Sequence, residues 1–357
     1  MAIDPVAVAE AATGSSVSAA TVTARVPIVY DPFLSGRVVE RVTGVAERSE
    51  GPVPWSAVVK RTSGVDLRAA RRELAAYREG LAAALPAVGL RAPALLAWHS
   101  GSDDVEMWLE DVVDEHDGQW PIERFAVAAA HIGAWDLRAG ERDLPPGFDA
   151  EDAWAERHGQ PHRVAEALAE LASYSREPGA AAIADVLADP GFVRTRALIR
   201  STRGRIDDLS TYPRTMLHHD LVRSNLFAVG PATTVAIDWE NVGRGPLGVD
   251  LAPLVIGSVR RGEASADHLG RIESAVLDSY VGAAGGALTD RDRDIRAAYR
   301  LAIALRWHHV VGTIGAWLGH DAGRLRGSLP DEPRAEALRQ IAILSRHILD
   351  TAEAVPG

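Results

Sequence analysis

The sequence predicts an α+β protein in which a small β-rich part precedes a larger helical part. Short apolar or alternating runs fill roughly the first 113 residues, and apolar residues then recur at helical steps of three and four. The chain has 357 residues, of which 47% are hydrophobic and 24% charged, which is ordinary for globular proteins and long enough for two domains. We therefore expect one domain over residues 1–113 and a second over residues 114–357.

The first part reads as a sheet with one inserted helix. Residues 1–20 are small and polar, so we expect them to be frayed. Strand-like runs follow, separated by Gly and Pro, at residues 21–30, 36–46 and 55–62. An apolar stripe predicts a helix over residues 66–85, ended by Pro86. Residues 93–101 and 104–112 read as a hairpin.

The second part is mostly helical. An amphipathic stripe starts at Ile122 and ends at Trp135. Further helices are expected near residues 151–173, 180–188, 192–209, 266–281, 291–318 and 332–354. The helical pattern breaks at residues 211–220, and residues 225–239 read as another hairpin.

Composition excludes several classes of protein. The absence of cysteine rules out disulfide scaffolds, Cys-ligated metals and thiol catalysis. A net charge of -11 argues against non-specific nucleic-acid binding. The N-terminal residues do not resemble a signal peptide, and no apolar run is long enough to cross a membrane. We expect a cytoplasmic protein without nucleic-acid or membrane partners, and leave monomer and homodimer open.

One polar motif carries the most chemical information. Residues 216–227 contain the pattern H-x-D-x4-N, which places Asp220 five residues before Asn225. Asp238 follows thirteen residues after Asn225, beyond the second predicted hairpin. Phosphoryl transfer needs such a set, because one carboxylate orients the attacking hydroxyl while an amide oxygen and a second carboxylate hold Mg²⁺.

These residues resemble the aminoglycoside phosphotransferase and choline kinase-like family. That family has H-G-D-x4-N, then I-D-[WF]-[ED], then G-P-x-x-x-D-L-A. The matching positions here are His218, Asp220, Asn225, Asp238, Trp239, Glu240, Gly245, Pro246, Asp250, Leu251 and Ala252. The resemblance implies a two-lobed protein-kinase-like fold, with a small antiparallel sheet and one helix in the N-terminal lobe and a larger, mainly helical C-terminal lobe.

The same resemblance implies roles for the motif residues. Asp220 would be the catalytic base, Asn225 and Asp238 would be Mg²⁺ ligands, and Asp250 would brace the catalytic loop. His219 departs from the family pattern, which usually has Gly there, and its side chain could touch the acceptor or point away. Arg223 replaces a frequent Pro, without an evident role.

The only lysine of the chain has a place in this scheme. Of the 38 Lys and Arg residues, Lys60 alone is lysine. It ends the third predicted strand, in a run similar to the kinase V-A-I-K position. We expect Glu73 on the following helix to pair with Lys60 and aim it at the α- and β-phosphates, with Glu79 as the alternative partner. A compact ammonium would then be required where a planar guanidinium does not suffice.

Two further nucleotide contacts are expected in the N-terminal lobe. Residues 31–37, with Ser35 and Gly36, would form the loop over the phosphates, although the segment also fits an ordinary β-turn. The segment 108–112 would be the hinge, where the backbone carbonyl near Glu110 and the amide near Val112 pair with a purine edge.

The acceptor side is less well defined. Trp307, His308, His309 and Trp317 share one predicted helix that could wall the acceptor pocket, but core packing for Trp and surface positions for His are the favoured interpretation. Asp114, Glu115 and Asp117 could face a cationic acceptor, but a solvated charge run is favoured.

The sequence therefore predicts an enzyme that uses Mg²⁺ and transfers the γ-phosphate of ATP or GTP to a hydroxyl of a small molecule. The acidic charge slightly favours an amine-bearing acceptor. An antibiotic such as an aminoglycoside is the leading acceptor class, so that phosphorylation would give resistance. A sugar, amino sugar or choline is the metabolic alternative. A nucleotide-binding regulator without catalysis is a further alternative, and the lack of D-F-G and A-P-E patterns disfavours a protein kinase.

Overall fold

The chain divides into two compact units in a computed structural model that describes residues 3–28, 36–81, 88–116, 118–140, 148, 159–320, 325–327, 329 and 331–355. The first unit comprises Met1–Ala84, Arg91–Glu115 and Phe227–Val242, and the second comprises Leu85–Leu90, His116–Leu226 and Gly243–Gly357. The first unit is therefore discontinuous, because it includes residues 227–242, which the sequence analysis assigned to the second domain.

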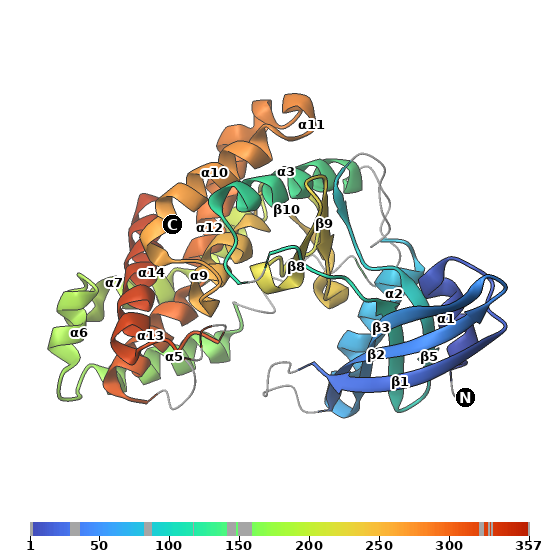
Figure 1. Cartoon of the computed structure of the whole chain (residues 1–357). Coiled ribbons are helices and arrows are strands. Elements are labelled where there is room, and N and C mark those ends of the chain that lie inside the picture. Colours follow the sequence, from blue (N-terminus) through green and yellow to red (C-terminus); the bar gives the residue numbers. More distant parts are fainter. Residues whose placement is uncertain are drawn as a thin grey trace. The chain divides into compact units, whose positions relative to one another are not determined.

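The first unit is built on a five-stranded antiparallel sheet (Figure 1). Its strands run in the order β1-β2-β3-β6-β5. Their bounds are β1 Ala19–Pro27, β2 Arg37–Arg48, β3 Gly51–Ser63, β5 Leu95–Ser100 and β6 Asp104–Glu110. The predicted sheet and the predicted hairpin over residues 93–112 are confirmed.

One helix lies on each face of this sheet. Helix α1 (Pro5–Thr13) buries Val8 and Ala9 against apolar side chains of β2, β3 and β6. Helix α2 (Leu67–Arg78) packs on the other face, against the β6 residues Val105, Met107 and Leu109. The prediction that residues 1–20 are frayed is wrong for α1, because Asp4 accepts a capping hydrogen bond from Val6 N–H and the helix covers apolar surface.

Strand alternation decides which residues of β3 face α2. Val59 lies in the cluster under α1, so Lys60 faces the opposite side. Lys60 pairs across the sheet with Met107 of β6 and with Val39 of β2. The lone lysine is therefore on the α2 face, buried at 6% exposure.

The hairpin predicted at residues 225–239 is present as strands β8 (Leu226–Val229) and β9 (Thr233–Ala236). The short strand β4 (Leu90–Arg91) pairs with β9 in a three-stranded sheet. In the second unit, β7 (Arg214–Leu217) pairs antiparallel with β10 (Gly243–Pro246).

The second unit is mainly helical, and α3 and α10 lie side by side in it (Figure 1). Its helices are α3 Ile122–Ala139, α5 Pro161–Tyr174, α6 Ala180–Val186, α7 Val193–Arg200, α8 Thr202–Leu209, α9 Ser258–Arg261, α10 Leu269–Val281, α11 Ala283–Gly286, α12 Asp292–Ala304, α13 Trp307–Leu318 and α14 Arg334–Ala354. Nowhere in the ranges given above is a helix both long and apolar enough to cross a membrane.

Two predicted helices are each divided in the structure. The region 192–209 forms α7 and α8, and the region 291–318 forms a 3₁₀ turn followed by α12 and α13. At the first break the hydroxyls of Ser201 and Thr202 donate to the carbonyls of Leu198 and Ile199. Such side-chain bonds compete with the helical ladder and commonly bend or interrupt it.

Candidate functional site

The loop that carries the H-x-D-x4-N motif, residues 218–225, follows β7 in the second unit; we call it the motif loop. Asp220 is partly exposed, and its backbone N–H donates to His218 Nδ1 over 3.3 Å. Asn225 is buried, and its Nδ2 donates to the Asp220 carbonyl over 2.9 Å and to Asp220 Oδ2 over 3.3 Å. The Asn225 side chain thus orients Asp220 through its nitrogen, and its carbonyl oxygen, the atom that binds Mg²⁺ in such sites, takes no part in this contact.

A fully buried carboxylate fixes the start of this loop. Asp250 Oδ2 accepts from the backbone N–H of His218 and Asp250 Oδ1 from that of His219, each over 2.7 Å. Hydrogen bonds to an ionised acceptor are short and strong. The loop conformation is therefore set by backbone contacts, in the bracing position that the resemblance gives to Asp250.

His219 has the backbone conformation of a glycine. Its φ is +68°, in the left-handed region that a non-Gly residue adopts at a cost. His219 is 3% exposed, and its ring lies against Gly245, where an added Cβ would be 2.8 Å from His219 Cε1. The position thus demands the conformation for which the family pattern has Gly, and the His219 ring is buried within the second unit.

A second carboxylate lies deeper in the same unit. Asp136 on α3 is fully buried, and Tyr280 Oη on α10 donates to its Oδ2 over 2.6 Å. Tyr280 Oη in turn accepts from Gly248 N–H over 3.2 Å, close to Asp250 in sequence. Burial, reinforced by the charge of Asp250, raises the pKa of Asp136 well above its usual value, and the Tyr280 hydrogen bond only partly opposes this.

Five charged side chains meet in the first unit; we call them the charged cluster. They are Arg37, Lys60, Glu73, Asp238 and Glu240. Lys60 Nζ lies 2.5 Å from Glu73 Oε2 and also contacts Asp238 Oδ1. The predicted pairing of Lys60 with Glu73 is thus present. Glu79, the alternative, caps the C-terminus of α2.

The carboxylates of the charged cluster keep Lys60 protonated. Burial alone would lower the pKa of Lys60, but the carboxylates of Glu73 and Asp238 outweigh it and raise that pKa. Burial raises the pKa of Glu73 to about 7, against the opposing charge of Lys60. A buried ammonium between two carboxylates is stable only with both partners in place.

The backbone turns at Asp238, and the carboxylates of Asp238 and Glu240 lie near each other. Asp238 has a φ of +68°, which Asp tolerates better than most residues. Glu73, Asp238 and Glu240 each present a carboxylate oxygen within 4.8 Å of the others. Oxygen donors of this kind suit Mg²⁺. All three carboxylates now contact Lys60 or Arg37, but Glu73 is 1% exposed, whereas Asp238 is 7% exposed and Glu240 is partly exposed. Asp238 and Glu240 are therefore the two carboxylates most accessible to a divalent cation in this unit.

The sequence-based site missed two members of this cluster. Glu240 was recognised only as part of a pattern, and Arg37 only as the end of the predicted phosphate loop. Arg37 Nη2 lies 2.7 Å from Glu240 Oε2, and the Arg37 side chain is 2% exposed. Arg37 and Lys60 lie on the same face of the β2–β3 pair, since Val39 is opposite Lys60. Only the strand register reveals this proximity.

The predicted phosphate loop is described only at its end. Ser35 lies outside the described residues. Gly36 has a φ of +92°, and an added Cβ would be 2.5 Å from the Ser63 carbonyl oxygen. Gly36 is therefore required by the backbone itself, and a role at phosphates stays a prediction.

The predicted hinge residues lie at the end of β6. Glu110 pairs with both terminal nitrogens of Arg91, over 2.6 and 2.8 Å, and accepts from Ala94 N–H over 3.0 Å. The hydrogen bonds from the Arg91 side chain are the main reason why the pKa of Glu110 is lowered. The Glu110 side chain thus secures the strand end, and Val112 is buried at 9% exposure.

The residues considered for the acceptor have other contacts. Asp114 accepts from Ala228 N–H over 3.3 Å, and Glu115 accepts from Gly230 N–H over 2.6 Å, both at the β8–β9 hairpin. Asp117 lies outside the described residues. On α13, Trp307 is buried and His308 exposed, while His309 and Trp317 are partly buried.

Arg223 holds the segment before α3 to the motif loop. Its Nη2 donates to the carbonyls of His116 and Gly118, each over 3.1 Å. Its guanidinium also lies 4.6 Å from the centre of the Trp120 ring, at a distance typical of a cation–π contact. These contacts give Arg223 a structural place within the second unit.

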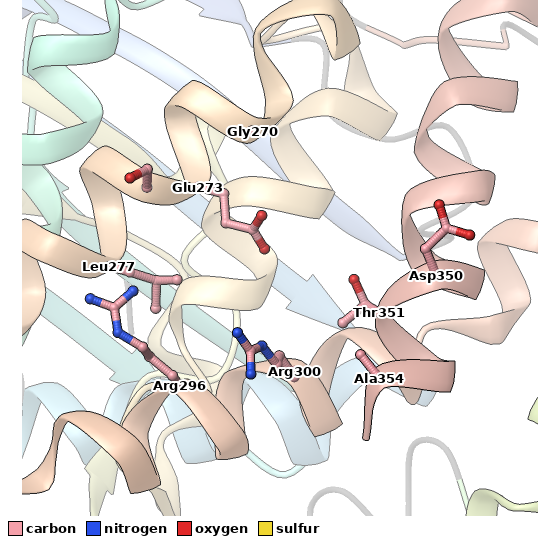
Figure 2. A pocket seen from close by; sticks show the side chains of 9 residues that line it. Gly270, Glu273, Leu277, Arg296, Arg300, Asp350, Thr351 and Ala354 are labelled. Carbon is pink, nitrogen blue, oxygen red and sulfur yellow. The ribbon is translucent and has the colours of Figure 1, made fainter. Parts of the chain in front are cut away.

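A cavity of about 480 Å³ lies among α10, α12 and α14 (Figure 2). Its lining residues are Gly270, Glu273, Ser274, Leu277, Arg296, Arg300, Asp350, Thr351 and Ala354. Arg296 is engaged by Asp278 and Asp292 at its rim. None of the described residues considered for the acceptor lines this cavity.

No family model and no curated protein matches this chain. Among solved structures, spectinomycin phosphotransferase, in complex with ADP and spectinomycin, is 10% identical, covers 96% of this chain and 95% of its own, and gives a TM-score of 0.50. An amicoumacin kinase is 14% identical over 94% of this chain and 90% of its own, with a TM-score of 0.49. An aminoglycoside phosphotransferase from Alicyclobacillus acidocaldarius is 15% identical over 93% and 92%, with a TM-score of 0.49. The chain therefore has the protein-kinase-like fold of spectinomycin phosphotransferase, as its sequence predicts.

Proposed function

We propose that this protein is a Mg²⁺-dependent phosphotransferase that moves the γ-phosphate of ATP or GTP to a hydroxyl of a small molecule. The observation that carries the proposal is the environment of Lys60. The only lysine of the chain is buried between carboxylates that two distant segments supply, Glu73 from α2 and Asp238 after β9. A phosphotransferase needs this arrangement to aim an ammonium at nucleotide phosphates.

The motif loop would supply the chemistry at the acceptor. The acceptor oxygen forms a bond to the γ-phosphorus while the bond from phosphorus to the β–γ bridging oxygen breaks. Asp220 orients the acceptor hydroxyl and takes its proton, and Asp250 holds the loop while this happens. Asn225 and Asp238 are the proposed Mg²⁺ ligands, with Glu240 as a further candidate; the bound ion would neutralise charge on the phosphates.

An antibiotic is the favoured acceptor class. Spectinomycin phosphotransferase carries an antibiotic beside ADP, and it shares the fold of this chain. The net charge of -11 suits an amine-bearing acceptor. A metabolic kinase for a sugar, amino sugar or choline-like molecule is the second candidate.

The test combines nucleotide binding with transfer. Asp220→Asn should keep the affinity for ADP within about twofold and lower turnover by about 10²- to 10⁴-fold, the usual contribution of a positioned base. Asp185→Asn, an exposed carboxylate on α6, is the matched control and should behave as wild type. Unchanged turnover in Asp220→Asn would remove the proposed role of this residue.

The acceptor is found by expressing the protein in a sensitive host against a panel of hydroxylated antibiotics. Resistance that disappears in the Asp220→Asn variant supports the antibiotic assignment. Phosphorylation of choline, ethanolamine or sugars without resistance supports the metabolic alternative. Nucleotide binding without transfer to any acceptor supports the regulator.

A further inference from the structure

Arg37 occupies a place at which a purely structural arginine is hard to explain. It is the first residue of β2 and the last residue of the segment 31–37, which the sequence predicts to lie over the phosphates. Its side chain is 2% exposed, although arginine loses much hydration energy on burial. The same strand carries Arg41, which pairs with Asp111 and keeps 47% of its side chain exposed.

Among the described residues, the contacts of Arg37 leave one nitrogen of its guanidinium without an acceptor. Nη2 pairs with Glu240 over 2.7 Å, and Nη1 lies 4.0 Å from Asp238 Oδ1. The Nε–H is buried and has no hydrogen-bond partner within the described part of the chain. A buried donor without an acceptor is costly, so a buried, unused arginine donor points to an anionic ligand.

The charge of the cluster points the same way. Within the described residues, the charged cluster joins three carboxylates, those of Glu73, Asp238 and Glu240, to the two cations Arg37 and Lys60. The two carboxylates that best fit a divalent ion are those that Arg37 and Lys60 contact now. Such an ion would satisfy Asp238 and Glu240 and leave the Arg37 guanidinium in need of a new anion.

We propose that Arg37 exchanges partners: it neutralises Asp238 and Glu240 in the empty site, and binds a nucleotide phosphate when a divalent ion takes these carboxylates. This inference rests on the proposed function and deepens it. It makes Arg37 a phosphate-binding residue of the first unit, in addition to Lys60. It also makes the ion and the arginine competitors for the same two carboxylates in the absence of nucleotide.

The experiment measures two affinities that must change in opposite directions. Mn²⁺ binding to the nucleotide-free protein is followed by electron paramagnetic resonance, and ADP binding in the presence of EDTA by calorimetry. Arg37→Gln should tighten Mn²⁺ binding by about 5- to 10-fold, because the competing cation is gone. It should weaken metal-free ADP binding by about 10- to 100-fold, because a charge-assisted phosphate contact is lost.

A mirror variant and a control keep the test informative. Glu240→Gln releases Arg37, so metal-free ADP binding should tighten by about 2- to 5-fold while Mn²⁺ binding weakens. Arg41→Gln removes an arginine from the same strand outside the cluster and should change neither affinity. If Arg37→Gln does not fold, as judged by circular dichroism, the Glu240→Gln pair of measurements decides alone.

The outcomes separate this inference from the proposed function. Opposite changes in Arg37→Gln support the exchange, even if no acceptor is ever phosphorylated. A lower melting temperature with both affinities unchanged, or both weakened, shows a structural ion pair and overturns it. If wild-type protein binds ADP and transfers phosphate but Arg37→Gln matches it in both affinities, only this inference fails. If the wild type binds neither ADP nor Mn²⁺, both fail.

Discussion

The motif loop and the charged cluster hold their functional groups by different means. In the motif loop, backbone N–H groups of His218 and His219 donate to Asp250, and the ring of His219 is buried. In the charged cluster, Lys60 and Arg37 reach their carboxylates through side chains alone. The first region is a fixed frame, whereas the second is a set of ion pairs that can change partners.

The difference follows from what each region has to do. A group that stabilises a transition state works best when its position costs no rearrangement during the reaction, which favours backbone contacts. If the charged cluster binds a nucleotide and an ion, as we propose, its carboxylates need a positive partner both with and without these ligands. This favours side-chain cations that can change partners. The predictions below test this contrast, beginning with the largest effect.

Removal of Lys60 should destabilise the first unit and make it respond to metal. Lys60→Met leaves Glu73 and Asp238 buried without their common partner, which costs about 3–5 kcal/mol in comparable buried pairs. Millimolar Mg²⁺ should recover part of this loss, since the ion can replace the cation. Urea denaturation with and without Mg²⁺ measures both effects, and Arg41→Gln serves as the exposed control. A loss that Mg²⁺ leaves unchanged would contradict the view of exchangeable charges.

Removal of Asp250 should be nearly as costly but indifferent to metal. Asp250→Ala leaves the buried N–H groups of His218 and His219 without their acceptor, which costs about 1–3 kcal/mol for each group. We expect a lower free energy of unfolding by about 2–4 kcal/mol, less than twice the upper value for one group because removal of the Asp250 charge also relieves its repulsion of Asp136. Turnover should be lost as well. Recovery of this variant by Mg²⁺ would erase the distinction between the two regions.

The sequence predicts some of these contacts because short motifs carry them. The run that ends at Lys60 is similar to the kinase V-A-I-K position, and the central place of Glu73 on the following helix favours it over Glu79 as the partner. The H-x-D-x4-N motif and its family resemblance single out Asp220. Arg37 escapes such reasoning because its proximity to Lys60 depends on the β2–β3 register, which a single sequence specifies weakly.

Other features depend on tertiary structure that no local pattern reports. Residues 5–13, which the sequence analysis expects to be frayed, form a helix whose Val8 and Ala9 find apolar surface on the sheet. The burial of His219 could not be foreseen either, because it depends on a left-handed φ and on the absence of a side chain at Gly245. The helix break at Ser201 reflects hydroxyls that bond backward, a choice that propensity alone does not settle.

Adding a methyl group at Gly245, against the His219 ring, should test how rigid the motif loop is. An Ala at position 245 would bring a Cβ within 2.6 Å of Leu217 Cδ1 and 2.8 Å of His219 Cε1. We expect Gly245→Ala to cost about 1–3 kcal/mol, as other overpacked cores do. In a His219→Gly background the cost should fall, because half of the clash is gone. A double-mutant cycle by urea denaturation measures this coupling, and a coupling below about 0.5 kcal/mol would mean that the loop yields freely.

The smallest expected effect concerns Asp136, whose ionised form is unfavourable inside the second unit. Burial and the nearby Asp250 raise the pKa of Asp136 well above the ordinary value of 3.8. A group whose pKa is raised by folding contributes stability that is complete below the unfolded pKa and is lost as pH rises through the folded pKa. Wild-type protein should therefore lose stability relative to Asp136→Asn by about 1 kcal/mol per pH unit, from above 3.8 up to the folded pKa.

Asp136→Asn keeps an acceptor for Tyr280 and removes the titratable group beside Asp250. The measurement is the difference in the free energy of unfolding between variant and wild type, taken by urea denaturation at several values between pH 5 and pH 8. Because both proteins share every other titrating group, the slope of this difference isolates Asp136, whatever the absolute stability of the variant. A difference that does not change with pH would mean that Asp136 is ionised in the folded protein. The frame behind the motif loop would then hold two carboxylate charges, and it would be as dependent on compensating cations as the charged cluster is.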